Sequence, residues 1–191
     1  GMEDGVASKT FTMLCWNIQN PSLRRARKQF SWLRRQPFDI LILTECKKSE
    51  GCLFLEASLQ GHVPVETDGC DVVFPKPAHD EYGVLIAGNV QLTPSGFSNC
   101  VKQYSPRVNP VTLRLLDQEM EVIGVYAPSR GFRSDKRRQK KKLFVSSFLE
   151  ALEAAPLSRL CILAGDFNVL EPSHVPHYPE FEEWEYEFYR A

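Results

Sequence analysis

The stretch LCILAGDFNVL, residues 160–170, decides the fold that the sequence predicts. Its apolar run ends at Gly165 and is followed at once by Asp166, Phe167 and Asn168. A short apolar run bounded by glycine is typical of a strand that is buried on both faces of a sheet. The acid and the amide would then lie at the carboxyl end of that strand, which is where open α/β sheets bind their ligands.

Three earlier stretches have the same form, an apolar run that delivers one polar side chain near its end. They are FTMLCWNI (11–18) with Asn17, DILILTE (39–45) with Glu45, and MEVIGVY (120–126) with Tyr126. Because all the polar groups follow strands at the same end, we expect them to form a single site. The expected catalytic residues are Asn17, Glu45, Tyr126, Asp166 and Asn168.

The residue types at these strand ends favour a hard divalent cation. Glu45 and Asp166 offer carboxylate oxygens, and Asn17 and Asn168 add neutral amides. Mg²⁺ and Mn²⁺ prefer oxygen ligands and commonly bind through one or two carboxylates, together with water and a substrate phosphate. We therefore expect Mg²⁺ or Mn²⁺ as the cofactor, and not a metal that needs thiolate or imidazole ligands.

The four motifs WNIQN, ILTE, VYAPSRG and GDFNV, in this order and at these separations, resemble the endonuclease/exonuclease/phosphatase family. The resemblance covers almost all of residues 11–168 and is closest to the exonuclease III and abasic-site endonuclease branch. It implies a four-layer α/β sandwich, in which two packed mixed β-sheets are flanked by helices and the site lies at one end between the sheets.

The resemblance also implies a role for each residue of the expected site. Glu45 resembles the principal metal ligand, and Asp166 resembles the carboxylate that orients or deprotonates the attacking water. Asn17 would help to fix the metal beside these two carboxylates. Asn168 would contact the phosphate and position Asp166, and Tyr126 would hydrogen-bond the scissile phosphate.

The chain departs from the family pattern in two places. Gln19 stands where relatives often carry an acid, which weakens a second metal contact there. The family also continues past GDFN with an aspartate-bearing strand and a terminal Ser-Asp-His motif, and no such pattern occurs before Ala191. We therefore expect residues 11–191 to be the N-terminal portion of the domain, with an incomplete catalytic set, and residues 1–10 to be a disordered or tag-derived N-terminus. The incomplete sandwich would expose a sheet edge and an apolar face, which favours dimerisation.

A basic segment marks where a polyanionic substrate could bind. RSDKRRQKKK, residues 133–142, begins a long predicted helix on the side of the expected site. Two interpretations stay open: a solvated helix face, or a phosphate-binding surface with salt-dependent affinity. Two histidines in the loop after GDFN are either metal ligands or, as we favour, exposed contacts near the substrate groove. The candidate substrate-binding residues are Arg130, Arg133, Lys136, Arg137, His174 and His177.

The remaining pattern predicts helices separated by strands. The expected helices span 22–36, 50–59, 131–153 and 180–191, and the other expected strands span 63–65, 71–74, 82–87 and 108–116. The buried stripe of the third helix is expected to consist of Leu143, Phe144, Phe148, Ala151 and Leu152.

Composition and charge exclude several other classes of protein. The 191 residues carry a net charge of −1 and are 43% hydrophobic, which is ordinary for a globular domain. No apolar run reaches the roughly 20 residues of a membrane span, so no membrane partner is expected. The six cysteines lack the spacing of a zinc site, and we expect them to be buried and reduced, as in a cytoplasmic protein.

Taken together, the motifs predict a metal-dependent phosphodiesterase, and specifically a DNA nuclease that uses metal-assisted attack by water. Two alternatives stay open. One is a phosphatase or phosphodiesterase of the same superfamily that acts on a small phosphoester. The other is a nucleic-acid-binding module that keeps the fold without the chemistry, which the missing Asp/His segment favours.

Overall fold

The computed structural model describes residues 10–61, 69–97, 101–115, 117–131, 134–155, 160–171, 173–176 and 181–191. In chain order the elements are β1 (Met13–Asn17), α1 (Leu23–Leu33), β2 (Ile40–Cys46), α2 (Glu50–Leu59), β3 (Asp71–Val73), β4 (Gly83–Gly88), β5 (Thr93–Pro94), the 3₁₀ helix η2 (Ser105–Arg107), β6 (Val108–Leu115), β7 (Gln118–Tyr126), α3 (Asp135–Ala154), β8 (Cys161–Asp166) and α4 (Glu183–Arg190). The strand expected at 63–65 lies outside the described residues.

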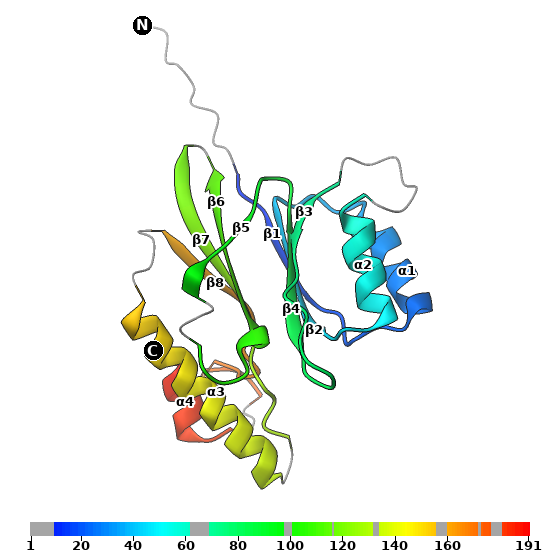
Figure 1. The fold of residues 1–191 in the computed structure, drawn as a ribbon. Helices are drawn as coiled ribbons and strands as arrows, with labels where there is room; N and C mark the ends of the chain where they lie inside the picture. The colour runs from blue at the N-terminus through cyan, green and yellow to red at the C-terminus, as the bar shows by residue number, and fades with distance from the viewer. Residues whose placement is uncertain are drawn as a thin grey trace, which may run out of the picture.

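The strands form two four-stranded sheets, both of mixed direction. The first has the order β1-β2-β4-β3, with β1 parallel to β2 and the other neighbours antiparallel. The second has the order β5-β6-β7-β8, with β6 antiparallel to both β5 and β7, and β7 parallel to β8. Figure 1 shows the sheets face to face, with α1 and α2 outside the first sheet and α3 and α4 outside the second. The predicted α/β sandwich of two mixed sheets flanked by helices is confirmed.

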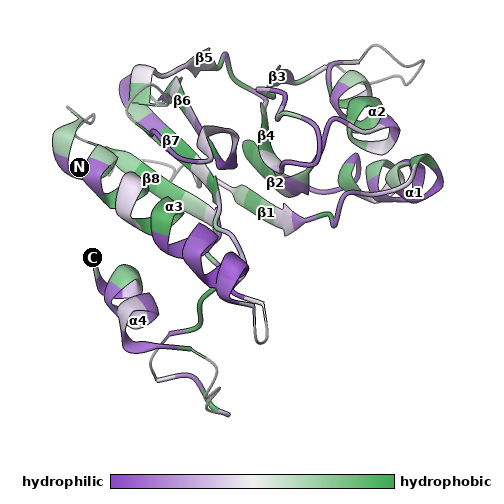
Figure 2. Cartoon of the chain, turned by 60° about the horizontal axis from the view of Figure 1, so that its bottom comes forward, coloured by the Kyte–Doolittle hydropathy of each residue, from purple (hydrophilic) through white to green (hydrophobic). Residues whose placement is uncertain are grey.

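Alternating side chains of the central strands explain how the layers hold together. In β2, Ile40 and Ile42 pack between the sheets, whereas Leu41 and Leu43 pack against α1 and α2. The strands β4 and β7 alternate in the same way, and Figure 2 shows these inner strands coloured as hydrophobic. A strand covered by a sheet on one face and by helices on the other is apolar throughout, which is why its sequence is a continuous apolar run.

The strands β1 and β8 are edge strands, which corrects the expectation that LCILAGD is buried on both faces. Leu163 in β8 is 41% exposed, and Cys15 in β1 is also exposed. Among the described residues neither strand pairs with a neighbour on its outer side. An apolar run cannot distinguish an edge strand from a central one, because both pack between the same two layers. The described cysteines are free, as expected, but only Cys46 and Cys52 among them are buried, whereas Cys70 and Cys161 are half-buried and Cys15 is exposed.

Helix α3 buries most of the expected stripe, since Phe144, Phe148 and Ala151 are buried and Leu152 packs half-buried against the same core, but Leu143 does not belong to it. The buried residues are Lys141, Phe144, Val145, Ser147, Phe148 and Ala151. Leu143 is 48% exposed, because it lies between Lys141 and Phe144 and faces away from the second sheet. Within the described ranges, no helix combines the length and the apolar character that crossing a membrane requires.

Gly124 of β7 allows the two sheets to approach closely. A Cβ at this position would lie 2.9 Å from Val84 Cγ1 and 3.0 Å from Ile86 Cδ1, both in the facing sheet. Gly124→Val is therefore expected to lower the free energy of unfolding by about 1–3 kcal/mol, the usual cost of overpacking. Urea unfolding measures the change. Gly96→Val is the control, because nothing lies within 4 Å of a Cβ there, and equal losses in the two variants would contradict this account.

Candidate active site

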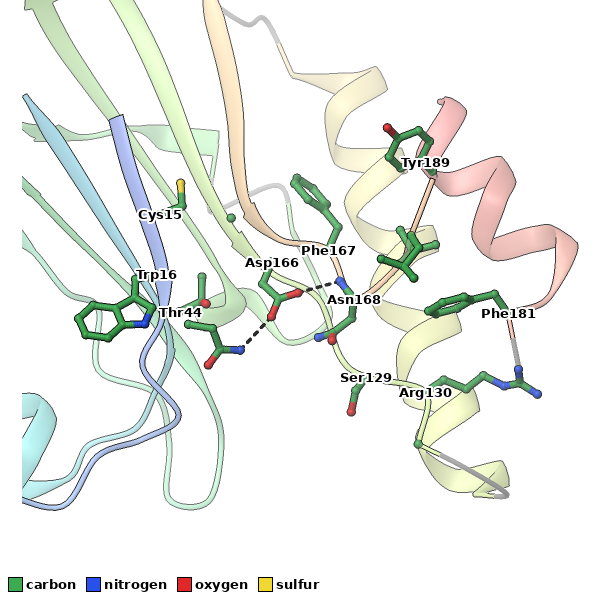
Figure 3. A pocket seen from close by; sticks show the side chains of 15 residues that line it. Cys15, Trp16, Thr44, Ser129, Arg130, Asp166, Phe167, Asn168, Phe181 and Tyr189 are labelled. Carbon is green, nitrogen blue, oxygen red and sulfur yellow. Dashed lines mark hydrogen bonds between the residues drawn. The ribbon is translucent and has the colours of Figure 1, made fainter. Parts of the chain in front are cut away.

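The polar residues at the ends of β1 and β8 meet across the two sheets. Side chains alternate between the two faces of a strand, so Asn17 lies on the same face of β1 as Met13, which packs between the sheets. In β8, Asp166 lies on the same face as Ile162 and Ala164, which also pack between the sheets. Asn17 Nδ2 donates a hydrogen bond to Asp166 Oδ2 at 2.9 Å, and this bond is drawn in Figure 3. Residues 149 positions apart in the chain are thereby joined.

The Asp166 carboxylate is held from a second side by the turn that follows β8. Its Oδ1 accepts a hydrogen bond from the backbone N–H of Asn168 at 3.0 Å. Asn168 has a φ of +51°, a left-handed conformation that asparagine tolerates better than most residues. Its side-chain amide donates to the Ala127 carbonyl at 2.6 Å, and the Ala127 N–H donates to the Asp166 carbonyl at 2.8 Å. The turn is therefore tied to the end of β7, and the carboxylate has a fixed orientation.

Gly165 explains why the GDFN motif begins with glycine. Its φ is +142°, and a Cβ there would lie 2.0 Å from the Val125 carbonyl oxygen. Any side chain would therefore push β8 away from β7 and displace Asp166, which follows directly.

Glu45 is presented to the site by an irregularity in β2. The pairing of β2 with β4 shifts register between Leu43 and Cys46, and Glu45 has a φ of +59°. Regular alternation would place Glu45 on the helix side with Leu43, and a bulge breaks that alternation. A non-glycine residue in the left-handed region costs of order 1–3 kcal/mol, and such residues gather at functional sites.

Tyr126 ends β7 on the inner face and pairs in register with Asp166. Burial and the negative charges of Glu45 and Asp166 raise the pKa of its hydroxyl well above the usual value of 10.0. Because both carboxylates act on this one hydroxyl, they converge on the same end of the sandwich.

A buried arginine, Arg107, packs against Tyr126 and holds it in place. This residue was not identified from the sequence. The Arg107 guanidinium lies 4.9 Å from the centre of the Tyr126 ring and donates to the Tyr126 carbonyl at 3.2 Å. It also lies 5.4 Å from the centre of the Tyr82 ring, which packs edge-on against Tyr126. Burial lowers the pKa of Arg107. No sequence pattern marked Arg107, since it precedes β6 in a short 3₁₀ turn far from the motifs.

Ionisation of the Tyr126 hydroxyl is expected to lower the free energy of unfolding at high pH. Because its pKa is raised only in the folded chain, the unfolded chain releases this proton first once the pH exceeds about 10. The stability due to the protonated hydroxyl is therefore fully present below pH 10 and is lost above it, at up to about 1.4 kcal/mol per pH unit. Urea unfolding at about pH 9 and about pH 11 measures the loss, which should be smaller in Tyr126→Phe than in the wild type. Tyr189→Phe, which replaces an exposed tyrosine, is the control. If Tyr126→Phe lost as much stability between the two pH values as the wild type does, the prediction would be contradicted.

A cavity of about 880 Å³ opens beside the Asn17–Asp166 bond. Figure 3 shows Asp166 and Asn168 between the ends of β1 and β8 on one side and Phe181 and Tyr189 on the other. Asn17, Thr44, Ser129 and Arg130 also line the cavity, whereas Glu45 and Tyr126 do not. The Thr44 hydroxyl is buried, and among the described residues it has no hydrogen-bond partner. It is therefore an enclosed oxygen whose hydrogen-bonding capacity no described residue meets.

The oxygen donors at this end of the sandwich fit the expected Mg²⁺ or Mn²⁺. Glu45 and Asp166 supply carboxylates, and the Asn17 amide is hydrogen-bonded to the Asp166 carboxylate. Across the described part of the chain, no group of three or more His, Cys, Asp or Glu residues could hold a metal. One or two carboxylates completed by water and phosphate are the usual environment of Mg²⁺, whereas Zn²⁺ needs more protein ligands.

The expected substrate-binding residues occupy different surroundings. Arg130 lines the cavity and lies 3.9 Å from both Glu182 and Glu185. Lys136 and Arg137 are exposed in the first turns of α3, which Figure 2 shows as strongly hydrophilic. His174 is half-buried and does not line the cavity. Two further candidates, Arg133 and His177, lie outside the described residues.

Lys141 was interpreted wrongly as part of a solvated or phosphate-binding basic segment. It is completely buried, and its ammonium donates to the Asn168 carbonyl at 2.7 Å and pairs with the equally buried Glu185. The signal was its spacing, since Lys141 precedes Phe144 by one helical turn and Phe148 by two.

Several solved structures resemble this one, although no family model and no curated protein sequence matches the chain. An AP endonuclease from Archaeoglobus fulgidus is 21% identical, with a TM-score of 0.68 over 95% of this chain and 69% of the endonuclease. The 3′-5′ exonuclease NExo from Neisseria meningitidis is 20% identical, with a TM-score of 0.63 over 94% of this chain and 69% of NExo. A humanized D. rerio TDP2 is 17% identical, with a TM-score of 0.56 over 84% of this chain and 63% of TDP2. The chain therefore shares the fold of the AP endonuclease, of NExo and of TDP2.

Proposed function

We propose that this protein is a divalent-cation-dependent phosphodiesterase that cleaves DNA. The observation that carries the proposal is the hydrogen bond between Asn17 and Asp166, which fixes a carboxylate in the lining of a cavity, at the end of the sandwich where Tyr126 pairs in register with Asp166. The fold supports it, because similar structures include an AP endonuclease, a 3′-5′ exonuclease and a NExo 3′ phosphatase bound to a product DNA hairpin.

In the proposed reaction, Asp166 orients the attacking water and accepts its proton. A carboxylate within hydrogen-bond reach of water can act as a general base, and Asn17 and Asn168 each engage one of its oxygens and so fix its direction. Tyr126 keeps its proton and donates a hydrogen bond at the phosphate, because its pKa is raised. Glu45, Asn17 and Asp166 would hold the Mg²⁺ or Mn²⁺ ion, which when bound neutralises charge on the phosphate oxygens.

Positive charge beside the cavity supports a polyanionic substrate. Arg130 lines the cavity, and Lys136 and Arg137 are exposed at the start of α3. Contacts between such side chains and phosphates make binding salt-dependent. His174, Arg133 and His177 stay in the proposal as substrate contacts on the sequence argument alone, since His174 does not line the cavity and the other two lie outside the described residues.

The test compares substrates, using the full natural chain. The protein is incubated with each of three substrates: a plasmid with abasic sites, an unmodified plasmid and a small phosphodiester. Each incubation contains Mg²⁺, Mn²⁺ or a chelator. Nicking of DNA that stops in the chelator supports the proposal. Hydrolysis of the small ester alone would assign the site to a small phosphoester instead. Binding of DNA without turnover would identify a non-catalytic module, and either of the last two results overturns the proposal.

A further inference from the structure

We propose that Lys141, paired with Glu185, is a positioning residue that holds the Asp166–Asn168 turn in its reactive geometry. This inference rests on the proposed function, because the turn carries the proposed general base. It makes α3 and α4 part of the apparatus that sets the orientation of the Asp166 carboxylate.

Three polar groups of Asn168 are each fixed by a different element of the structure. Its N–H donates to Asp166 Oδ1, its side-chain amide donates to the Ala127 carbonyl, and its own carbonyl accepts from Lys141 Nζ at 2.7 Å. The left-handed φ of Asn168 depends on such support, since single residues in that region are strained. Two contacts reach the turn from outside β7 and β8: Asn17 of β1 holds the Asp166 carboxylate, and Lys141 of α3 holds the Asn168 carbonyl.

Lys141 is itself held in place by the start of α4. Glu185, which pairs with the Lys141 ammonium, also accepts from the Glu182 backbone N–H at 2.9 Å and thereby caps this helix. Arg138 of α3 pairs with Glu182 at 2.9 Å, and Arg130 lies 3.9 Å from Glu185. The ammonium therefore has one available position, directly against the Asn168 carbonyl.

The burial of this ion pair is difficult to explain by stability alone. Both side chains are completely buried, and replacing a buried ion pair by apolar residues of similar size is often neutral or stabilising. A methionine would exchange the cation–π contacts with Phe181 and Trp184, whose ring centres lie 5.5 Å and 6.0 Å from the ammonium, for sulfur–aromatic contacts of similar strength. What a methionine cannot supply is the hydrogen bond to the Asn168 carbonyl.

The test separates positioning from stability with Lys141→Met, Glu185→Gln and the double variant. Lys141→Met removes the nearest cation from the buried Glu185 carboxylate, which keeps only the more distant Arg130 guanidinium at 3.9 Å, and is expected to lower Tm by about 10 °C. The double variant removes both charges and keeps an acceptor for the Glu182 N–H, so most of the lost Tm should return. In both variants that lack Lys141, kcat on abasic-site DNA should fall about 10- to 100-fold while KM stays within about threefold.

Hydrogen exchange gives a readout that does not depend on activity. The Asn168 amide should exchange about tenfold faster in Lys141→Met and in the double variant than in the wild type. The matched control is Lys102→Met with Glu150→Gln, an exposed pair that also involves α3 and should change neither measurement. Wild-type kcat and wild-type Asn168 exchange in the double variant would overturn the inference. If the wild-type protein hydrolyses no phosphodiester, the proposed function fails, and the exchange rates alone decide whether Lys141 positions the turn.

Discussion

Replacement of Asp166 by asparagine is expected to slow hydrolysis of abasic-site DNA by about 10³-fold or more. The amide cannot accept a proton from water, so the proposed general base is lost. Asparagine has nearly the same shape, and the backbone of β8 has no reason to move. The loss should therefore appear in the chemical step under single-turnover conditions and not in the affinity for DNA.

The structure also predicts a small cost in stability for Asp166→Asn. Two donors, Asn17 Nδ2 and the Asn168 N–H, face the two carboxylate oxygens, and an amide offers only one oxygen in return. One hydrogen bond is lost, at about 1–2 kcal/mol. Asp135→Asn, in the exposed first turn of α3, is the control and should leave the rate unchanged. Wild-type turnover in Asp166→Asn would refute its assignment as the base.

Glu45→Gln is expected to lower turnover by about 10²-fold or more and to raise the Mg²⁺ concentration required for half-maximal rate by at least about tenfold. Glutamine keeps the size of the side chain and faces the same left-handed backbone strain. What it removes is the negative charge that a divalent cation requires. A Mg²⁺ titration of the rate and a calorimetric titration with Mn²⁺ measure the two effects.

Glu45→Gln has a second consequence that needs no turnover. The Glu45 charge helps to raise the pKa of Tyr126, so its removal should lower the pH at which Tyr126 ionises, which ultraviolet absorbance reports. Glu50→Gln, exposed in the first turn of α2, is the matched control. An unchanged Mg²⁺ requirement in Glu45→Gln would show that this residue holds no ion.

Most of the fold followed from local pattern. The expected helix 50–59 has the bounds of α2, and the meeting of Asn17 and Asp166 at one end of the two sheets followed from where the apolar runs end. Such runs reveal strands because burial on two faces requires apolar residues at every position. They do not reveal the order of strands in a sheet, so the edge positions of β1 and β8 could not be predicted.

The parts of the site that depend on tertiary packing were not predictable. The bulge that presents Glu45 arises from a register shift between β2 and β4, which no local pattern encodes. Lys141 was treated as a surface charge, because a buried lysine is recognised only once its partner Glu185 is brought to it by the fold. The roles that the resemblance implies for Glu45, Asp166 and their neighbours stay predictions until the variants are measured.

The central claim is that side chains from separate strands act as one hydrolytic centre, and the double variant Asp166→Asn/Glu45→Gln tests it most directly. Residues that act together in one chemical step have strongly non-additive effects. The account predicts that the double variant hydrolyses abasic-site DNA about as slowly as the slower single variant. Rate losses that multiply in the double variant would show that the two carboxylates act independently and would contradict the account.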